Sequence, residues 1–335
     1  MIDWSKLSLN YTKTPYRFVS HYKNGAWDEG GLTQSADVVL SEASCVLQYA
    51  QTCFEGLKAF TSAKGNIVVF RPDMNAKRFS DTLKRLVMPD YPIDKFVDAV
   101  LKTVRATKDY VPPYGINAAL YIRPFMVGTS SVINVIPSDE FEFRVFTTPL
   151  GSYFKSASSM KLLISDYDRA APNGTGGVKA GLNYAMSFYP SASAKAKGYN
   201  ECMYLDSKSR SYVEETGTAN IIFVDKDGTL VVPSSPSILP SITRKSLIYI
   251  AREYLNIKVV ERPVCCDELE NFAECGLCGT AAVISPVGCV DSPSRHVEFK
   301  DSSSGRGPVL EKLYKTYTAI QKEEIPAPDG WLYKV

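Results

Sequence analysis

Apolar and polar positions along the first half of the chain predict a mixture of strands and helices. Four apolar runs predict strands, at residues 57–60, 67–70, 118–126 and 141–148. The first two flank a Gly-containing turn at 63–66, which is typical of a β-hairpin. Apolar residues at helical spacing follow from Pro72 to Leu86, and a second helix is predicted over 94–110 between prolines.

The second half keeps the same mixture after an interruption. Residues 151–177 lose the periodicity and are rich in Ser, Gly, Asn and Pro, so we expect an interdomain connection that leads into a functional loop. Helices are predicted at 184–196, 244–254 and 308–321, and strands at 201–205, 219–224 and 230–232. The pattern predicts a mixed α/β chain in two halves.

Length and charge narrow the class of protein. A chain of 335 residues exceeds the size at which one hydrophobic core keeps growing, so two domains are expected. The net charge of +2, with the basic residues scattered, gives no basis for binding nucleic acid or an anionic membrane. The N-terminus lacks a signal-peptide pattern, and no apolar run is long enough to span a bilayer. We expect a cytoplasmic protein with small-molecule partners and reduced thiols.

Cys275 and Cys278 form a CxxC motif, which is compatible with redox chemistry or with half of a metal site. His21 and His296 are the only histidines, and no second CxxC completes a zinc tetrad. We therefore favour buried thiols and expect no metal site.

Lys179 lies in a glycine-rich stretch, residues 173–181, which suggests a backbone that passes close to a ligand. The sequence around Lys179 lacks the Gly-Lys-Ser/Thr of a phosphate-binding P-loop. Taken alone, Lys179 is better explained as an ordinary loop lysine than as a catalyst. A phosphate contact in a nucleotide-binding protein is a further alternative.

The motif around Lys179 is similar to the lysine segment of branched-chain aminotransferases, which are fold-type IV pyridoxal-phosphate enzymes. Further segments that resemble this family follow in order, at residues 49–56, 71–78, 121–124, 215–220, 238–244, 279–282, 320–321 and 330–331. The resemblance implies a small α/β N-terminal domain over 1–150, a connection over 151–168, and a larger C-terminal domain with a pseudo-barrel over 169–335. Leu182 departs from the glycine of many relatives, and a redox CxxC found in some of them after the Gly-Thr-Ala element is absent here.

The same resemblance implies pyridoxal 5′-phosphate as the cofactor. Lys179 would carry it covalently and later move the substrate proton, because a lysine amine can act both as nucleophile and as base. Glu215 would keep the pyridine nitrogen protonated, and Tyr184 would bind the phenolic oxygen. The residues implied for the phosphate are Arg78, Ile242, Thr243 and Thr280.

The substrate residues are also carried over from the family. The side-chain pocket and the carboxylate end would involve Tyr49, Phe54, Tyr121, Tyr153, Thr218 and Ala281. Arg123, on the same strand face as Tyr121, would read the second carboxylate of glutamate. Ile133 and Val135 match a loop that reaches into the partner subunit, which implies a homodimer.

The implied reaction is ping-pong transamination of L-leucine, L-isoleucine and L-valine with 2-oxoglutarate. Two other activities within this fold stay open, a D-amino-acid aminotransferase and an aminodeoxychorismate lyase. The segments at 121–124, 279–281 and 330–331 favour the branched-chain type. The sequence does not rank the three amino acids, because one methylene changes binding by only about 1–3 kcal/mol.

Overall fold

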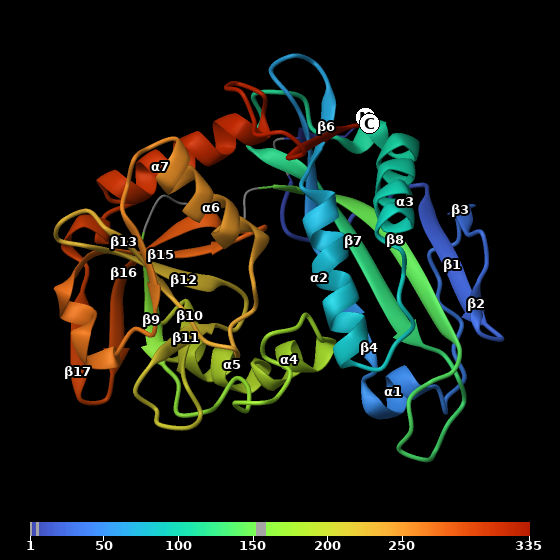
Figure 1. Cartoon of the computed structure of the whole chain (residues 1–335), viewed down its shortest axis with the longest axis horizontal. Helices are drawn as coiled ribbons and strands as arrows, with labels where there is room; N and C mark the ends of the chain where they lie inside the picture. The colour runs from blue at the N-terminus through green and yellow to red at the C-terminus, as the bar shows by residue number, and fades with distance from the viewer. Residues whose placement is uncertain (1, 5–6, 152–158) are drawn as a thin grey trace. The chain divides into compact units, whose positions relative to one another are not determined.

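The computed structural model describes residues 2–4, 7–151 and 159–335. The chain forms two compact units (Figure 1). The first comprises Met1–Tyr153, Val178–Leu182 and Ala319–Val335, and the second comprises Phe154–Gly177 and Asn183–Thr318. The short segment around Lys179 therefore packs with the N-terminal part of the chain. The domain limits at 150 and 168 stay a prediction.

The first unit contains an antiparallel sheet in the order β18-β6-β5-β7-β8-β1-β2, with β3 paired to β1 and β4 paired to β7. Its strands are β1 (Arg17–Lys23), β2 (Ala26–Trp27), β3 (Gly31–Thr33), β4 (Thr52–Phe54), β5 (Leu57–Thr61), β6 (Ile67–Phe70), β7 (Ala118–Gly128), β8 (Phe141–Gly151) and β18 (Leu332–Lys334). The two longest strands, β7 and β8, pair in register from Ala118↔Gly151 to Gly128↔Phe141. This long ladder forms the centre of the unit.

The helices of the first unit are α1 (Cys45–Tyr49), α2 (Pro72–Arg85), α3 (Ile93–Ala106) and the short η2 (Lys108–Tyr110). Pro72 suits the first turn of α2, where its missing N–H costs no hydrogen bond. Phe79 of α2 and Phe96 of α3 pack on Phe143 of β8, with ring centroids 5.6 and 5.8 Å from that of Phe143. Burial of each such ring contributes about 1.5–3 kcal/mol, which fixes both helices on the sheet.

The second unit contains a closed barrel of six strands. The order β11-β10-β9-β16-β15-β12 closes because β11 also pairs with β12, while β13, β14 and β17 extend the sheet. The strands are β9 (Met160–Ile164), β10 (Glu201–Leu205), β11 (Val213–Thr216), β12 (Asn220–Asp225), β13 (Leu230–Pro233), β14 (Val259–Arg262), β15 (Phe272–Gly279), β16 (Val283–Ser292) and β17 (Arg295–Glu298). The barrel interior includes Phe223, which stacks on Phe272 with ring centroids 4.6 Å apart.

Helices accompany this barrel: α4 (Gly181–Met186), α5 (Phe188–Ala196), α6 (Ile242–Glu253), α7 (Pro308–Gln321), and the short η3 (Cys266–Asn271) and η4 (Lys300–Ser302). Ser241 caps α6 by accepting a hydrogen bond from the Arg244 amide at 3.2 Å. In the part of the chain that the structure describes, no helix is both long and apolar enough to cross a membrane.

Most predicted elements are confirmed, and two predictions are wrong. The predicted helix over 184–196 is broken at Ser187 into α4 and α5, because Pro190 has no N–H to continue a single helix. The predicted irregular stretch 151–177 contains β9, which lies between β10 and β16 and is parallel to both. This strand has only five residues, includes the exposed Lys161 and is flanked by Ser, so its periodicity is too short to be recognised in the sequence.

Candidate active site

The backbone around Lys179 is held by two elements of the first unit. Ala180 forms an isolated bridge with Cys53, and the Phe54 amide donates to the Lys179 carbonyl at 3.3 Å. The Lys179 amide donates to Oγ1 of Thr82 on α2 at 3.1 Å. The Lys179 Nζ lies 4.8 Å from the centre of the Phe54 ring, within cation–π distance. The amine is thus placed by β4 and α2 together.

The glycines directly before Lys179 are required by close contacts within the protein. A Cβ at Gly176 would lie 2.4 Å from the Ser237 carbonyl oxygen and 2.7 Å from Nη2 of Arg169. A Cβ at Gly177 would lie 2.6 Å from the Pro236 carbonyl oxygen. Only glycine lets this loop pass so close to the 236–237 backbone.

Arg78 on α2 forms a buried, bidentate ion pair with Glu55. Its Nε and Nη2 lie 2.8 and 2.7 Å from the two carboxylate oxygens, and Asn75 donates to the same carboxylate at 2.7 Å. Burial alone would raise the pKa of Glu55, but the Arg78 guanidinium, with help from Lys179 and Asn75, lowers it below its usual value. Glu55 therefore stays ionised and fixes the direction of Arg78.

Phe54 of β4 lies beside Tyr121 and Arg123 of β7, the two residues that the sequence places on one strand face. The Arg123 guanidinium carbon lies 4.5 Å from the centre of the Phe54 ring, and Nη2 donates to the Tyr121 hydroxyl at 2.9 Å. A Cβ at Gly56 would lie 2.2 Å from that hydroxyl, so glycine is needed for Tyr121 to occupy this position. The Arg123 Nε is buried without a hydrogen-bond partner among the described residues.

The remaining candidates of the first unit lie near its surface. Tyr49, the last residue of α1, is 37% exposed and its hydroxyl donates to the carbonyl of Ile133. Ile133 and Val135, in the loop between β7 and β8, are 73% and 85% exposed. Tyr153 lies outside the described residues.

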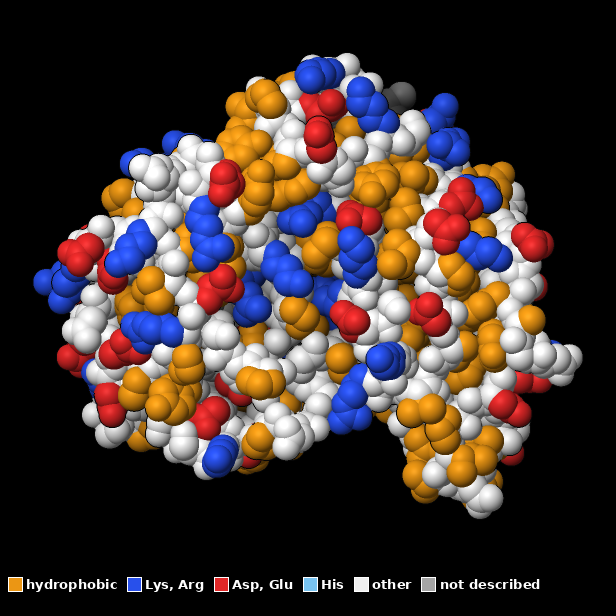
Figure 2. Space-filling view, viewed as in Figure 1, with side chains coloured by type: hydrophobic (Ala, Val, Ile, Leu, Met, Phe, Trp, Pro, Cys, Tyr) orange, Lys and Arg blue, Asp and Glu red, His pale blue; other side chains and the backbone are white. Residues whose placement is uncertain are grey.

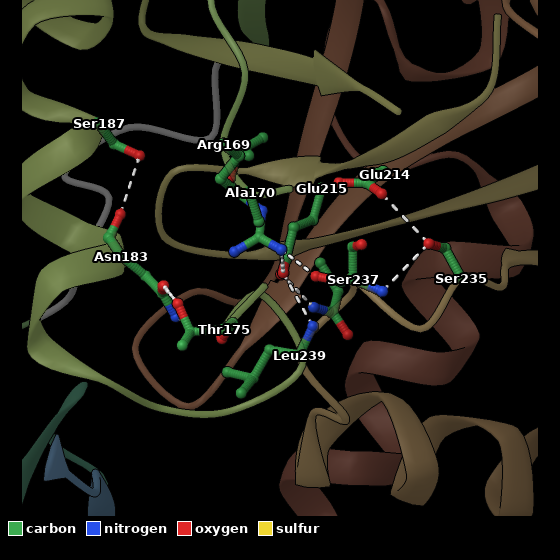
Figure 3. Close-up of polar contacts among 12 residues, drawn as sticks. Arg169, Ala170, Thr175, Asn183, Ser187, Glu214, Glu215, Ser235, Ser237 and Leu239 are labelled. Carbon is green, nitrogen blue, oxygen red and sulfur yellow. Dashed lines mark hydrogen bonds and ion pairs between the residues drawn. The ribbon is translucent and has the colours of Figure 1, made fainter. Parts of the chain in front are cut away.

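Glu215 is the centre of a buried polar network in the second unit (Figure 3). Its Oε1 accepts from the Leu239 amide at 2.8 Å and lies 3.0 Å from Nη2 of Arg169, and its Oε2 accepts from the Asn220 side chain at 2.6 Å. Arg169 also donates to the Ser237 carbonyl. The two neutral donors and the guanidinium of Arg169 fix the orientation of this buried carboxylate.

Glu214 precedes Glu215 on β11 and therefore points to the opposite side of the strand. It is buried too, and its carboxylate accepts from the Ser235 hydroxyl at 3.1 Å (Figure 3). Burial raises the pKa of Glu214, the nearby charge of Glu215 adds to this, and Arg169 opposes it. Two adjacent acids thus have different environments, and Arg169 pairs directly with only one of them.

The other candidates of the second unit lie on α4, at the start of α6 and in the turns that join its strands. Ile242 and Thr243 form the buried first turn of α6, where backbone N–H groups have no partner within the helix. Thr280 and Ala281 lie in the turn between β15 and β16, and Tyr184 is half-buried on α4. The first turn of α6 has the features of an anion site.

Cys275 and Cys278 are free, fully buried thiols on β15, which confirms the prediction that these thiols are buried. Burial raises the pKa of Cys278 to about 12 and that of Cys275 also lies well above its usual value. A thiol in such surroundings is not a reactive nucleophile.

Sequence reasoning misses the partners that orient these candidates. Glu55 could have been found, because a lone acid between Phe54 and Leu57 in an apolar segment is unusual. Arg169 has no such signal, since one arginine in a polar connection is ordinary. The amide of Leu239 is a backbone donor, which no residue type reveals.

Comparison with known proteins agrees with this geometry. A family model described as amino-transferase class IV matches residues 52–289. The branched-chain-amino-acid aminotransferase of Haemophilus influenzae is 45% identical over 340 residues, covering 100% of this chain and 99% of that protein. That of Helicobacter pylori is 42% identical, covering 100% of this chain and 98% of that protein.

The chain belongs to the branched-chain aminotransferase family. A solved branched-chain amino acid aminotransferase from T.th., which holds pyridoxamine 5′-phosphate, has a TM-score of 0.80 and 27% identity to this chain, covering 96% of this chain and 98% of that one. As a class IV aminotransferase, the chain is an enzyme, and the expected fold-type IV architecture with a barrel in the second unit is confirmed.

Proposed function

We propose that this branched-chain aminotransferase transfers the amino group of L-leucine, L-isoleucine or L-valine to 2-oxoglutarate by a ping-pong reaction. The observation that carries the proposal is the cluster of Lys179, Phe54, Tyr121 and Arg123. The Lys179 amine lies near the Phe54 ring, and the Arg123 guanidinium contacts both that ring and the Tyr121 hydroxyl. Such a pocket suits a branched apolar side chain, and its cation suits the second carboxylate of glutamate.

The residues present fit pyridoxal 5′-phosphate as the cofactor. The cofactor, when bound, accepts the electron pair left on the substrate Cα as its proton departs. Lys179 would attach it and then receive that proton on Nζ. Glu215 would hold the proton on the ring nitrogen, because Arg169, Asn220 and Leu239 fix the position of its carboxylate.

The phosphate group of this cofactor needs donors and positive charge. Arg78 would supply a guanidinium whose direction is fixed by Glu55, and the first turn of α6 at Ile242 and Thr243 would supply backbone amides. Thr280 would add a hydroxyl, and Tyr184 would bind the phenolic oxygen of the ring.

The substrate would be positioned by residues of two kinds. The apolar part would lie against Tyr49, Phe54 and Tyr121, with Tyr153 as a further wall, whereas Thr218 and Ala281 would serve the carboxylate end. Arg123 would bind the distal carboxylate of glutamate and withdraw when an apolar side chain enters. The contact of Arg123 with the Phe54 ring offers its guanidinium a resting place in the second case.

We also propose a homodimer and a cytoplasmic location. Hydrophobic side chains gather over α1 and the loop between β7 and β8 (Figure 2). The large apolar residues exposed there are Leu47, Ile133, Val135 and Ile136. Monomeric proteins seldom leave such a group uncovered, which favours a second copy as its cover. The eight free cysteines suit a reducing compartment.

Lys179→Ala tests the proposal directly. Wild-type protein treated with cofactor and borohydride should carry a pyridoxyl group that mass spectrometry locates on Lys179, and transamination of L-leucine should be lost in the variant while its circular dichroism is unchanged. A panel of L- and D-amino acids with 2-oxoglutarate should show turnover of the L-branched-chain members. A label on another lysine, or turnover of D-amino acids alone, would refute the proposal.

A further inference from the structure

A group of metal-ligating side chains lies on the β16–β17 hairpin, and it shares no residue with the candidate active site. Cys289 and Asp291 are two positions apart on β16 and so project from the same face of the strand. His296 is the direct cross-strand neighbour of Asp291. The pairing of the two strands thus brings a thiol, a carboxylate and an imidazole to one place.

The geometry of this group is compact. One ligand atom from each of Cys289, Asp291 and His296 lies within 4.8 Å of the other two, and Nδ1 of His296 is 2.5 Å from Oδ1 of Asp291. No other group of three such residues meets this spacing in the parts of the chain that the structure describes. The three atoms need only small adjustments to surround one ion at the bond lengths of zinc, about 2.0–2.3 Å.

We propose that Cys289, Asp291 and His296 bind a divalent zinc-class ion that pins β17 to β16. The donor set decides the class of ion, because thiolate and imidazole favour zinc over the hard cations magnesium and calcium. Three protein ligands leave the fourth tetrahedral position for water. This is a site of the hairpin itself and takes no part in transamination.

The surroundings of the group support a cation. The Cys289 thiolate and the Asp291 carboxylate together would balance the two charges of the ion. Glu298 is the cross-strand partner of Cys289 and adds a further carboxylate at the rim, whereas Lys161 is the partner of Cys289 on the other side, in β9. The Lys161 ammonium opposes a bound cation, and the Glu298 carboxylate offsets that charge.

The group is accessible to solvent at His296 and is held rigidly at Cys289. The His296 side chain is 63% exposed, so an ion can reach the site from solvent. Cys289 is 8% exposed and lies between two strands, which holds the thiol in a fixed direction. A site with one exposed and two more buried ligands can exchange its ion without unfolding of the hairpin.

The first test measures zinc binding by the untagged holoenzyme. Equilibrium dialysis against zinc, followed by metal analysis, should give one equivalent per chain, and competition with a chromophoric chelator gives the affinity. His296→Gln and Cys289→Ser should each weaken this binding by at least about 100-fold. Loss of a residue that only supports a ligand costs up to about 100-fold in metal affinity, and these two residues are ligands themselves. Cys266→Ser removes a half-buried thiol of η3, which lies beside β17 but is not one of the three ligands. It is the matched control and should bind like wild type.

The second test distinguishes a thiolate-bound ion from metal held by the cofactor. Cobalt added to the holoenzyme should give a thiolate charge-transfer band in the difference spectrum against Cys289→Ser carrying the same cofactor. Zinc should also raise the Tm of wild type and of Cys266→Ser, since a ligand that binds only the native state stabilises it. It should leave the Tm of His296→Gln unchanged. Equal zinc affinity in wild type, Cys289→Ser and His296→Gln, or a cobalt band that persists without Cys289, would overturn the proposal.

Discussion

Nη2 of Arg169 lies 3.0 Å from Oε1 of Glu215, and the two residues are only 5% and 4% exposed. A buried pair of this kind adds little net stability, but removal of one partner leaves the other charge uncompensated. Arg169 touches no group that the proposed reaction transforms. It is a positioning residue for Glu215.

Arg169→Gln should therefore lower the free energy of unfolding by about 3–5 kcal/mol and weaken cofactor retention. Chemical denaturation and the cofactor content after dialysis measure the two effects. Arg252→Gln breaks an exposed pair with Glu261 and should cost no more than about 1 kcal/mol. Arg169→Lys should recover part of the loss. Equal stability of the Arg169→Gln and Arg252→Gln variants would contradict this role.

Glu214 and Glu215 give a matched pair of neutral substitutions. Glu215→Gln should lower kcat/KM for L-leucine by at least about 100-fold, the scale of a lost electrostatic contact at a reacting group, whereas Glu214→Gln should keep most of the activity. Steady-state kinetics separates them. Comparable losses in both variants would argue against Glu215 as the acid that serves the ring nitrogen.

The raised pKa of Glu214 also predicts a pH effect. Between the usual carboxyl pKa and the raised native one, the folded protein holds a proton that the unfolded chain has released. The free energy of unfolding therefore falls as the pH rises through this window. Glu214→Gln should remove that fall. Denaturation curves should then show that the free energy of unfolding of the variant increasingly exceeds that of wild type as the pH rises toward neutral. Parallel pH profiles would show that burial does not perturb this acid.

Gly56→Ala should displace Tyr121, because the new Cβ would lie 2.2 Å from the tyrosine hydroxyl. Overpacking of this kind costs about 1–3 kcal/mol of stability, and KM for L-leucine should rise as the wall moves. Gly31→Ala is the control, since its Cβ would meet no heavy atom within 4 Å and its backbone conformation suits alanine. Thermal unfolding and KM together report the outcome, and an unchanged KM in Gly56→Ala would count against Tyr121 as a pocket wall.

Arg123→Ala should reduce kcat/KM for L-glutamate at least about 30-fold more than for L-leucine, which corresponds to about 2 kcal/mol for an unpaired carboxylate. The reason is that only glutamate brings a second negative charge. Arg123→Lys keeps the charge and should recover part of the glutamate activity. Equal losses for the two amino acids would show that Arg123 shapes the pocket without reading charge.

Val135→Glu should weaken the proposed homodimer, because burial of a charge in an apolar interface is strongly unfavourable. Light scattering after size exclusion should show a shift toward monomer at dilution. Ile93→Glu is a fitting control, since Ile93 is also exposed, at 40%, and an acid is favourable at the first turn of α3. An unshifted mass for Val135→Glu would place the interface elsewhere.

The sequence predicts the elements whose patterns are local. The β5–β6 hairpin and helices α2 and α7 follow from periodicity and from proline positions, and the structure places them where expected. Strand β9 escapes prediction because its five residues include the exposed Lys161 and are flanked by Ser, so that the segment resembles a loop until its neighbours are known. Closure of the barrel through the β11–β12 pairing depends on long-range pairing, which periodicity does not report.

For the candidate site, the residue types were predictable but their partners were not. Phe54, Tyr121 and Arg123 could be grouped from motif and strand alternation. The pairing of Arg78 with Glu55 joins positions 23 residues apart, and Arg169 reaches Glu215 from another segment, so neither shows in local sequence. Their energetic weight comes from burial, which is a property of the folded chain.

The attachment of Lys179 to β4 has a consequence for engineering this enzyme. Phe54, a residue that would be replaced to change substrate preference, also donates its amide to the Lys179 carbonyl and lies under the Lys179 amine. Selectivity and reactivity are therefore mechanically linked through one short strand. Libraries that vary Phe54 will therefore trade turnover for new specificity.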